Sequence, residues 1–186
     1  MHKFLKLFAC TIILFSLLTN SVFSAKGENP LLDQEKKIHK SFVEAIPADK
    51  FIDVHQFKKV YDDVISGKKS AYLIDVRSHE EFYAFHIEGT DHIHAGHMYT
   101  IPKKIKDPNA EIYIFCRTSH RAKYVTGFLY KYGYKNVYCY KEGIVGWAKA
   151  KHPFVNQFTG KFKIIEYRKK PSKIEKSFRI REFHPY

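Results

Sequence analysis

Short apolar runs alternate with segments of helical periodicity along the middle of the chain, and this alternation constrains the fold most strongly. Residues 71–76 are apolar at almost every position, as expected for a strand buried on both faces of a parallel sheet. A second run, at residues 111–115, precedes a helical segment in the same way. Strands that alternate with helices at this spacing predict βαβ units around a parallel sheet. We therefore expect an α/β fold.

The same pattern predicts the individual elements of this fold. Strands are expected at 51–52, 71–76, 92–94, 111–115 and 136–140. Helices are expected at 54–66, after Ser78, at 118–132 and at 143–150. Ser78 and Glu81 have the spacing of a capping box at the start of the second of these helices. Alternating residues at 161–167 predict an added edge strand.

The hexapeptide 116–121, Cys-Arg-Thr-Ser-His-Arg, lies between a predicted strand and the helix that follows it. A thiol at this junction faces unpaired backbone N–H groups and the positive end of the helix dipole. Both favour the thiolate, which is the nucleophilic form of cysteine. Arg117, Arg121 and Lys123 add positive charge nearby. Because ligands of open parallel sheets bind beyond the carboxyl ends of the strands, we expect Cys116 to lie in a reactive site that holds an anion.

Several blocks of sequence occur in the order that is typical of one family. They are Ile74-Asp75-Val76-Arg77, Glu80-Glu81-Phe82, 86–90, the Cys116 loop with Arg121, 133–137, Glu142-Gly143-Ile144, Gly146-Trp147 and Pro153. Together these blocks resemble a rhodanese domain over about residues 50–155. The resemblance implies a rhodanese-like, open, mainly parallel five-stranded sheet with helices on both faces.

Rhodanese domains are sulfurtransferases, and the resemblance implies a role for each loop residue. Cys116 would take a sulfane sulfur from a small anionic donor such as thiosulfate and become a persulfide. It would then pass the sulfur to a nucleophilic acceptor such as a thiol or cyanide. Arg121 would act beside Cys116 in catalysis. The other loop residues would bind the substrate: Arg117, Thr118, Ser119 and His120. The resemblance implies no metal and no organic cofactor.

The length of the cysteine loop bears on which chemistry is expected. Four residues separate Cys116 from Arg121. In the related phosphatases and arsenate reductases, the corresponding loop resembles a cysteine, five residues and then an arginine. The extra residue widens the loop for a tetrahedral oxyanion. The shorter loop therefore favours sulfur over phosphate chemistry. A non-enzymatic sulfane-sulfur carrier stays open as an alternative, and an oxyanion phosphatase or reductase is less favoured. Ser119 stands where many family members carry glycine, which suits a positive φ.

Asp75 and Arg77 match the Asp-x-Arg pattern of the family at a strand end. We interpret them as structural support for the cysteine loop, through a charge pair or backbone hydrogen bonds. Cys139 lies on the strand expected to neighbour that of Cys116. It is predicted to be a buried packing residue, and a resolving thiol or a disulfide with Cys116 stays open as an alternative.

His92, His94 and His97 form a second group of chemically capable side chains. Histidines at i and i+2 of a strand share one face, so His92 and His94 are candidates for chelating a metal. No cysteine or glutamate completes a ligand set in this segment. We therefore expect no metal here.

The N-terminus has the three parts of a secretory signal. Residues 1–6 are basic, 7–18 are apolar, and small polar residues precede a predicted cleavage after Ser24. An uncleaved membrane anchor is the alternative. It is less favoured because the apolar part is shorter than the roughly 20 residues that a membrane span needs. We predict a signal peptide at 1–24, a lead-in with a short amphipathic helix at 25–49, the rhodanese-like domain at 50–155 and a basic extension at 156–186. The signal predicts a periplasmic location.

The chain is basic, with 32 Lys and Arg against 19 Asp and Glu and a formal net charge of +13. This charge would assist the approach of an anionic donor. Basic residues with aromatic neighbours can bind nucleic acid, but an exported protein rarely meets any, so we expect no nucleic-acid partner. For the 156–186 extension, an acidic protein partner or an anionic membrane surface is the alternative to a solvated tail.

Overall fold

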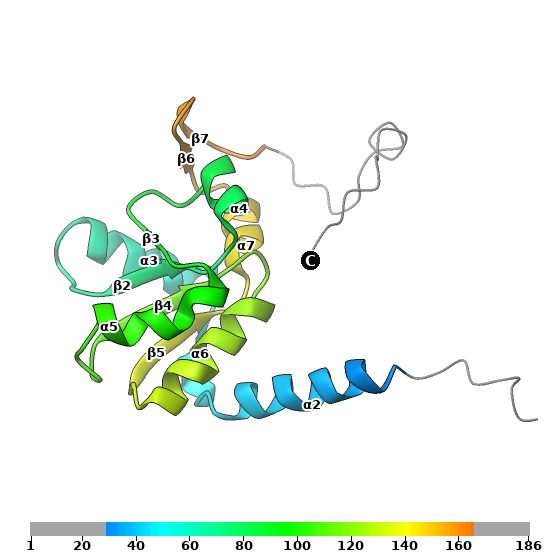
Figure 1. Ribbon diagram of the computed structural model, residues 1–186. Coiled ribbons are helices and arrows are strands. Elements are labelled where there is room, and N and C mark those ends of the chain that lie inside the picture. Colours follow the sequence, from blue (N-terminus) through cyan, green and yellow to red (C-terminus); the bar gives the residue numbers. More distant parts are fainter. Residues whose placement is uncertain (1–28, 166–186) are drawn as a thin grey trace, which may run out of the picture. The chain divides into compact units, whose positions relative to one another are not determined.

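The computed structural model describes residues 29–165, which fall into two compact units. One unit ends at Ile38, and the other begins at His39 and holds the central sheet (Figure 1). The predicted signal peptide at 1–24 and residues 166–186 of the predicted extension lie outside the described residues. Within residues 29–165, no helix has both the length and the apolar character needed to cross a membrane.

In the described part of the chain, five parallel strands form the central sheet, in the order β1-β5-β4-β2-β3. They are β1 (Phe51–Ile52), β2 (Tyr72–Asp75), β3 (Asp91–His92), β4 (Glu111–Phe115) and β5 (Asn136–Tyr140). Strand β4 is central and pairs with β2 on one side and β5 on the other. The predicted parallel five-stranded sheet is confirmed, and its central strand ends directly before Cys116.

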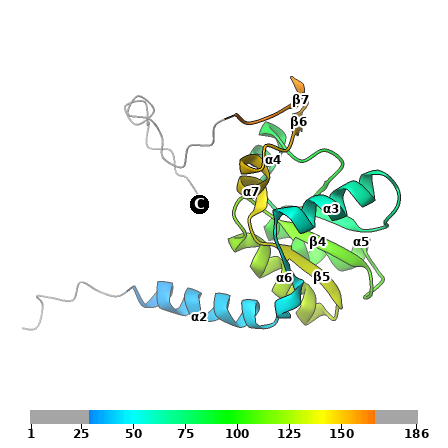
Figure 2. The same cartoon turned by 180° about the vertical axis from the view of Figure 1, so that it is seen from behind.

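Helices cover both faces of this sheet. Figure 1 shows α5 and α6 in front of it, and Figure 2, from behind, shows α3 and α7 on the other face. The α-helices are α2 (Pro30–Glu44), α3 (Val54–Ile65), α4 (His79–Ala84), α5 (Ile101–Lys104), α6 (His120–Tyr132) and α7 (Gly143–Lys149). There are also two 3₁₀ turns: η1 (Ala48–Lys50) leads into β1, and η2 (Ala95–Thr100) leads into α5.

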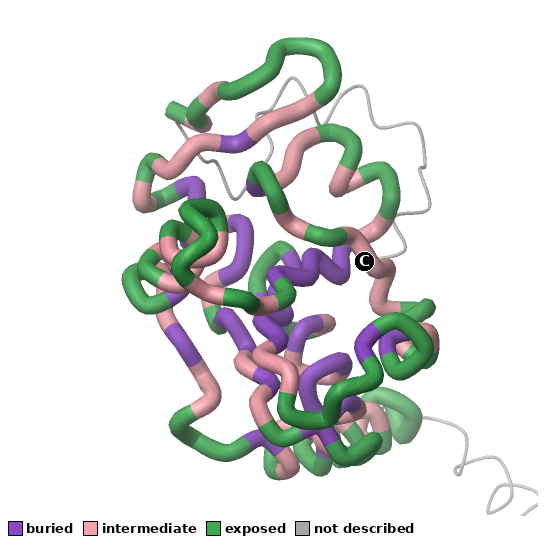
Figure 3. The backbone as a smooth tube through the Cα atoms, turned by 90° about the vertical axis from the view of Figure 1, so that its left-hand side faces the viewer, coloured by how far each residue is buried: buried purple, intermediate pink, exposed green. Residues whose placement is uncertain are grey.

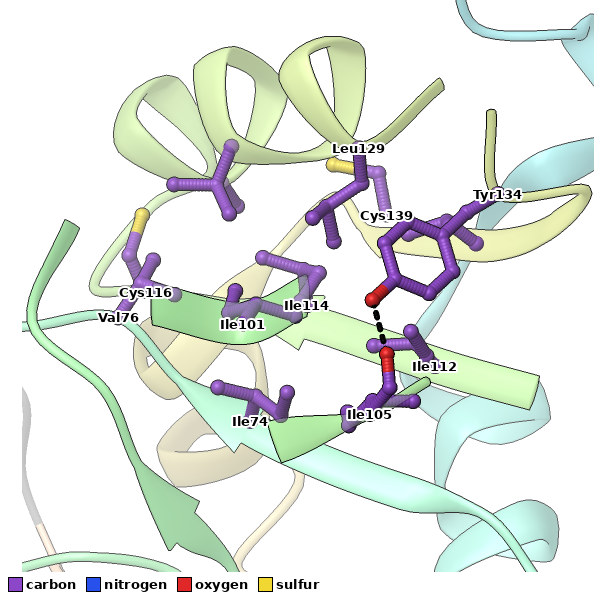
Figure 4. Close-up of a cluster of buried hydrophobic side chains, with 13 residues drawn as sticks. Ile74, Val76, Ile101, Ile105, Ile112, Ile114, Cys116, Leu129, Tyr134 and Cys139 are labelled. Carbon is purple, nitrogen blue, oxygen red and sulfur yellow. Dashed lines mark hydrogen bonds between the residues drawn. The ribbon is translucent and has the colours of Figure 1, made fainter. Parts of the chain in front are cut away.

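Each face of the sheet has its own apolar core, and buried segments run through the middle of the chain trace (Figure 3). The face under α6 carries aliphatic side chains and both cysteines, and Tyr134 there donates a hydrogen bond to the Ile105 carbonyl (Figure 4). The other face is aromatic. Phe57 stacks on Tyr140 at 4.4 Å between ring centroids and meets Trp147 edge-on at 5.8 Å. Such pairs add about 0.5–1.5 kcal/mol beyond the area that they bury.

Local sequence signals explain where several helices begin. The Ser78 side chain accepts a hydrogen bond from the Glu81 N–H, and the Glu81 carboxylate accepts one from the Ser78 N–H, so the predicted capping box is present. Asp53 and Gln56 form a second capping box at α3. Both boxes satisfy N–H groups that the first helical turn leaves without a partner.

Two elements differ from their sequence-based predictions. Strand β3 ends at His92, and His94 instead caps η2 by accepting a hydrogen bond from the Gly96 N–H. The prediction that His92 and His94 share one strand face is therefore wrong. The edge strand predicted at 161–167 is also wrong in its pairing. Strand β7 (Gly160–Phe162) pairs with β6 (Phe154–Asn156) in a separate antiparallel hairpin. A strand this short has too little alternation to show which partner it pairs with.

Candidate active site

Cys116 lies at the carboxyl end of the central strand, where the chain turns from β4 into α6. The residue is buried, with 1% of its surface exposed. The backbone N–H of Ser119 points back at it and donates a hydrogen bond to the Cys116 Sγ at 3.2 Å. One of the backbone N–H groups that the sequence places around this thiol is therefore aimed at the sulfur.

Ser119 obtains this orientation by adopting a left-handed backbone, with φ of 110° and ψ of −18°. Among residues 29–165, Ser119 and Lys151 are the non-glycine residues with positive φ. An L-residue in the left-handed region is strained by roughly 1–2 kcal/mol, which glycine avoids. Position 119 therefore has the backbone conformation that favours glycine, and Ser119 is strained because it adopts this conformation with a β-carbon.

The carbonyl side of the cysteine loop is held by the start of α7. The Ile144 N–H donates to the Cys116 carbonyl at 2.9 Å, and the Val145 N–H donates to the Arg117 carbonyl at 3.1 Å. Gly143 has a φ of +55°, and a β-carbon there would overlap the carbonyl oxygen of Cys116. The loop can approach α7 this closely because Gly143, the first residue of the helix, has no side chain.

Arg121 makes a two-pronged contact with Glu81 of α4. Its Nη1 lies 2.5 Å from Glu81 Oε2, and its Nη2 lies 2.9 Å from Oε1. Burial lowers the pKa of Arg121, but the hydrogen bonds and charge of Glu81, together with the charges of Cys116 and Asp75, outweigh this and raise it. Arg121 therefore remains a cation, held in place by Glu81. The sequence identified Glu81 as a helix cap and as part of a family block, but no local pattern links it to a residue 40 positions away.

Asp75 and Arg77 form a buried ion pair at the end of β2. The Arg77 Nε donates to both Asp75 carboxylate oxygens, at 3.0 and 2.8 Å, and its Nη2 lies 2.7 Å from Oδ2. Arg77 also donates to the backbone carbonyls of Glu81 and Phe85, at 3.0 and 2.7 Å. The predicted charge pair is present. Through these contacts it fixes α4, and α4 in turn holds Arg121 through Glu81.

The sequence of this domain matches a known protein family. Residues 57–150 match the family described as the Rhodanese-like domain. The chain belongs to the rhodanese-like domain family. YrkF of Bacillus subtilis, named as a sulfur carrier protein, is 30% identical over 97 residues, 52% of this chain and 50% of that protein. The match thus spans only half the length of that relative. The thiosulfate sulfurtransferase GlpE of Haemophilus influenzae is 28% identical over 86 residues, 46% of this chain and 81% of that protein.

Solved structures share the rhodanese-like fold with this chain. The polysulfide-sulfur transferase of Wolinella succinogenes aligns with a TM-score of 0.54 and 21% identity, over 73% of this chain and 96% of that one. The thiosulfate sulfurtransferase of Pseudomonas aeruginosa aligns with a TM-score of 0.53 and 20% identity, over 69% of this chain and 25% of that one. These alignments and the parallel sheet confirm the predicted fold class.

The remaining loop residues of the rhodanese-like domain differ in their exposure. Ser119 is buried, whereas three others are exposed: Arg117, Thr118 and His120. The His120 ring stacks on that of His39, from α2, with 4.4 Å between centroids. Tyr124 packs against both rings, at 4.9 and 5.5 Å. His39 lies outside the residues that match the family, and sequence reasoning gave no signal for its place beside the loop.

Cys139 lies on β5 beside Ile114, fully buried in the same apolar cluster as Cys116. Both cysteines are free thiols, and Figure 4 shows their sulfur atoms apart. Burial, reinforced by the charge of Cys116, raises the pKa of Cys139 to about 12. Cys139 is therefore buried as predicted for a packing residue. A thiol with so high a pKa is also a poor nucleophile at neutral pH.

The histidines singled out in the sequence lie together near α4, where their rings are neighbours of the His79 ring. Within residues 29–165, no group of three or more His, Cys, Asp or Glu side chains has an arrangement that would hold a metal ion.

Proposed function

We propose that this rhodanese-like protein is a sulfurtransferase that moves a sulfane sulfur from a donor such as thiosulfate to a nucleophilic acceptor through a Cys116 persulfide. The observation that carries the proposal is the hydrogen bond from the Ser119 N–H to the Cys116 sulfur, at the carboxyl end of β4. Arg121, at the end of the same loop, stays cationic and is held by Glu81. Relatives named as a thiosulfate sulfurtransferase and as a sulfur carrier support this class of function.

The reaction has two halves and needs no external oxidant or reductant. In the first half, the Cys116 thiolate attacks the outer sulfur of thiosulfate. A new S–S bond forms, the bond to the sulfonate sulfur breaks, and sulfite leaves with the electron pair. In the second half, cyanide or a thiolate attacks the outer sulfur of the persulfide. The bond to Cys116 Sγ then breaks, and the cysteine returns as a thiolate.

Each half-reaction moves negative charge within the cysteine loop, and the residues around it can stabilise that charge. The Ser119 N–H is fixed in place before reaction, so no reorganisation is needed as charge develops. Arg121 is held by Glu81 and supplies positive charge for the departing sulfite. Arg117, Thr118 and His120 are exposed on the loop and would contact the donor.

The similarity to a sulfur carrier favours a second candidate function. In that case Cys116 would hold the persulfide but release it only to a docked partner, without turnover of small acceptors. The periplasmic location, the signal peptide at 1–24 and a partner for the basic extension are further parts of the proposal. The intact mass of the exported protein would test cleavage after Ser24.

The full chain should be incubated with thiosulfate and cyanide, and thiocyanate should be measured. We expect thiocyanate to form with the wild-type chain and to be lost with Cys116→Ala, whereas Cys139→Ala should retain it. A persulfide mass on Cys116 without thiocyanate would favour the carrier. Absence of both persulfide and thiocyanate would contradict both candidates.

A further inference from the structure

Four histidines gather near Arg121, at the end of the sheet where β2 and β3 finish. We call them the histidine cluster: His79 of α4, His92 of β3, and His94 and His97 at η2. The His79 ring centroid lies 4.8 Å from that of His92, 6.1 Å from that of His94 and 6.5 Å from that of His97. Those of His94 and His97 are 5.7 Å apart. Two separate segments of the chain, one at His79 and one spanning 92–97, therefore contribute to one group of imidazoles.

The cluster is accessible to solvent and is not part of either apolar core. His79 and His97 are exposed, and His92 and His94 are half-buried. Two exposed tyrosines border it, with Tyr83 stacked near His79 and Tyr99 edge-on to His97. A solute can therefore reach the imidazoles without any rearrangement of the core.

Hydrogen bonds within the fold set the tautomers of the two half-buried rings. His94 Nδ1 accepts a hydrogen bond from the Gly96 N–H at 3.2 Å, so the neutral ring carries its proton on Nε2. His92 Nε2 lies 2.9 Å from the Arg77 carbonyl, which can only accept, so His92 donates there. Protonation of His94 places the second proton on Nδ1 and therefore requires loss of the hydrogen bond from Gly96.

The charges that face His94 come from every element around it. His97 shares its turn, His79 and the exposed Glu80 lie on α4, and His92 lies on β3. Arg121 of α6 also acts on His94. Burial lowers the pKa of His94, and the positive charges of His97, His79, Arg121 and His92 lower it further. Two carboxylates of α4 bear on the cluster: the charge of Glu80 interacts with His79 and His94, and Glu81 pairs with Arg121 and offsets part of its charge.

We propose that the histidine cluster and Arg121 form a second anion-binding subsite, on the Arg121 side of the Cys116 loop, which takes doubly charged sulfur oxyanions and binds them more tightly as the pH falls. The class of anion rests on the proposed sulfurtransferase function, whereas the binding itself does not. A group of imidazoles on which the charge of Arg121 also acts is suited to this role, because histidine is the side-chain type whose ordinary charge change lies near neutral pH. A bound dianion would offset the positive charges that lower the pKa of His94.

The direction of the pH dependence of anion binding follows from the linkage between anion binding and proton binding. If the anion favours the protonated cluster, binding must take up protons, and lower pH must strengthen binding by the same coupling. Uptake of one proton corresponds to an increase in affinity of up to about tenfold for each unit of pH. Thiosulfate remains a dianion between pH 5.5 and 8, so any change in its affinity across this range reports on the protein.

The test is calorimetric titration of the full-length Cys116→Ala chain with sodium thiosulfate between pH 5.5 and 8, in buffers of different ionisation enthalpy and with EDTA present. We expect affinity to rise severalfold as the pH falls, with about one proton taken up. His79→Gln and the double change His79→Gln with His94→Gln should remove most of the uptake. Because His79 is exposed, its single variant tests the proposal even if the double variant fails to fold. His55→Gln, an exposed histidine on α3, is the matched control and should change neither quantity.

Thiosulfate binding without proton uptake, or uptake that persists in the His79→Gln variant, would overturn the subsite. Binding that appears only when zinc is added in place of EDTA would also overturn it and would indicate a metal-dependent site. Failure of the proposed function has a different signature. If wild-type chain forms no thiocyanate while the Cys116→Ala chain binds thiosulfate with proton uptake, the subsite stands and the sulfurtransferase does not. Turnover without linked proton uptake would instead support the sulfurtransferase and overturn the subsite.

Discussion

The backbone N–H of Ser119 lies 3.2 Å from the sulfur of Cys116, and Ser119 reaches this position with a left-handed φ of 110°. An L-residue is strained in this region, and such strain persists only where the surrounding structure enforces it. Hydrogen bonds from α7 hold the carbonyls of Cys116 and Arg117 in the same loop. The cysteine loop thus combines a buried nucleophile, a backbone donor aimed at it and a strained residue that orients the donor.

Replacing Ser119 with glycine should relieve this strain, and replacing it with alanine should not. We expect Ser119→Gly to be more stable than Ser119→Ala by about 1 kcal/mol, because both variants lack the hydroxyl and only alanine keeps the β-carbon at positive φ. Urea unfolding of the two purified variants measures the difference. Equal stabilities would show that the backbone at residue 119 is not strained.

Gly143 should be intolerant of any side chain because a β-carbon there overlaps the Cys116 carbonyl. Gly67 is a matched control, since it also has a positive φ, of +73°, but a β-carbon there meets no atom within 4 Å. We expect Gly143→Ala to be less stable than Gly67→Ala by about 1–3 kcal/mol, the usual range for overpacking. Thiocyanate formation should be lost in Gly143→Ala and kept in Gly67→Ala. Similar behaviour of the two variants in both assays would argue against the close approach of α7 to the loop.

The strands that position the site can be predicted from the sequence because they are strongly patterned. The strands predicted at 111–115 and 136–140 match β4 and β5 at both ends. Each is a compact run rich in β-branched and aromatic residues that follows a turn signal. The two-residue β3 is predicted only approximately, because so short a strand has no detectable periodicity. The capping box at Ser78 is predictable because its two partners are three residues apart.

Long-range contacts of the site cannot be predicted in the same way. Glu81 and Arg121 are 40 positions apart, and His39 meets His120 from a helix outside the family match. Nothing in the local pattern of either segment specifies such a partner, because these contacts depend on how the elements pack together. The conformation of Ser119 is an intermediate case. The family pattern indicates a glycine-like backbone, but only the structure shows that serine adopts it.

Cys139 should resist alkylation in the folded protein. It is fully buried, and its pKa is raised to about 12, so almost no thiolate is present at pH 8. We expect iodoacetamide at pH 8 to leave Cys139 unmodified in native protein and to modify it fully in urea, as measured by peptide mass spectrometry. The urea sample is the control for intrinsic reactivity. Modification of Cys139 in native protein at the rate seen in urea would contradict its burial and would revive its role as a resolving thiol.

Glu81→Gln should destabilise the protein in a pH-dependent manner. Burial raises the pKa of the Glu81 carboxyl, but hydrogen bonds from Arg121 and the Ser78 N–H, with the charges of Arg121 and Arg77, outweigh it and lower the pKa below the ordinary 4.5. The folded state therefore favours the carboxylate. Its stabilisation is complete above the ordinary pKa and is lost as the pH falls through the folded value. We expect a loss of about 1–2 kcal/mol at pH 7, typical of charged hydrogen bonds, which shrinks toward zero below pH 4.

Urea unfolding of wild type and Glu81→Gln at several values between pH 7 and pH 3 measures this difference. Glutamine retains one oxygen that can accept the Ser78 N–H, so the helix cap survives, whereas the charge that faces Arg121 and the acceptor for its Nη2 are lost. Glu88→Gln is the matched control, because Glu88 pairs with Lys161 at 2.6 Å while both side chains are more than half exposed. An exposed pair is screened by water and contributes little. If the two variants lose the same free energy at every pH, the Glu81–Arg121 pair does not hold the guanidinium in place, and another contact must position Arg121 beside the cysteine loop.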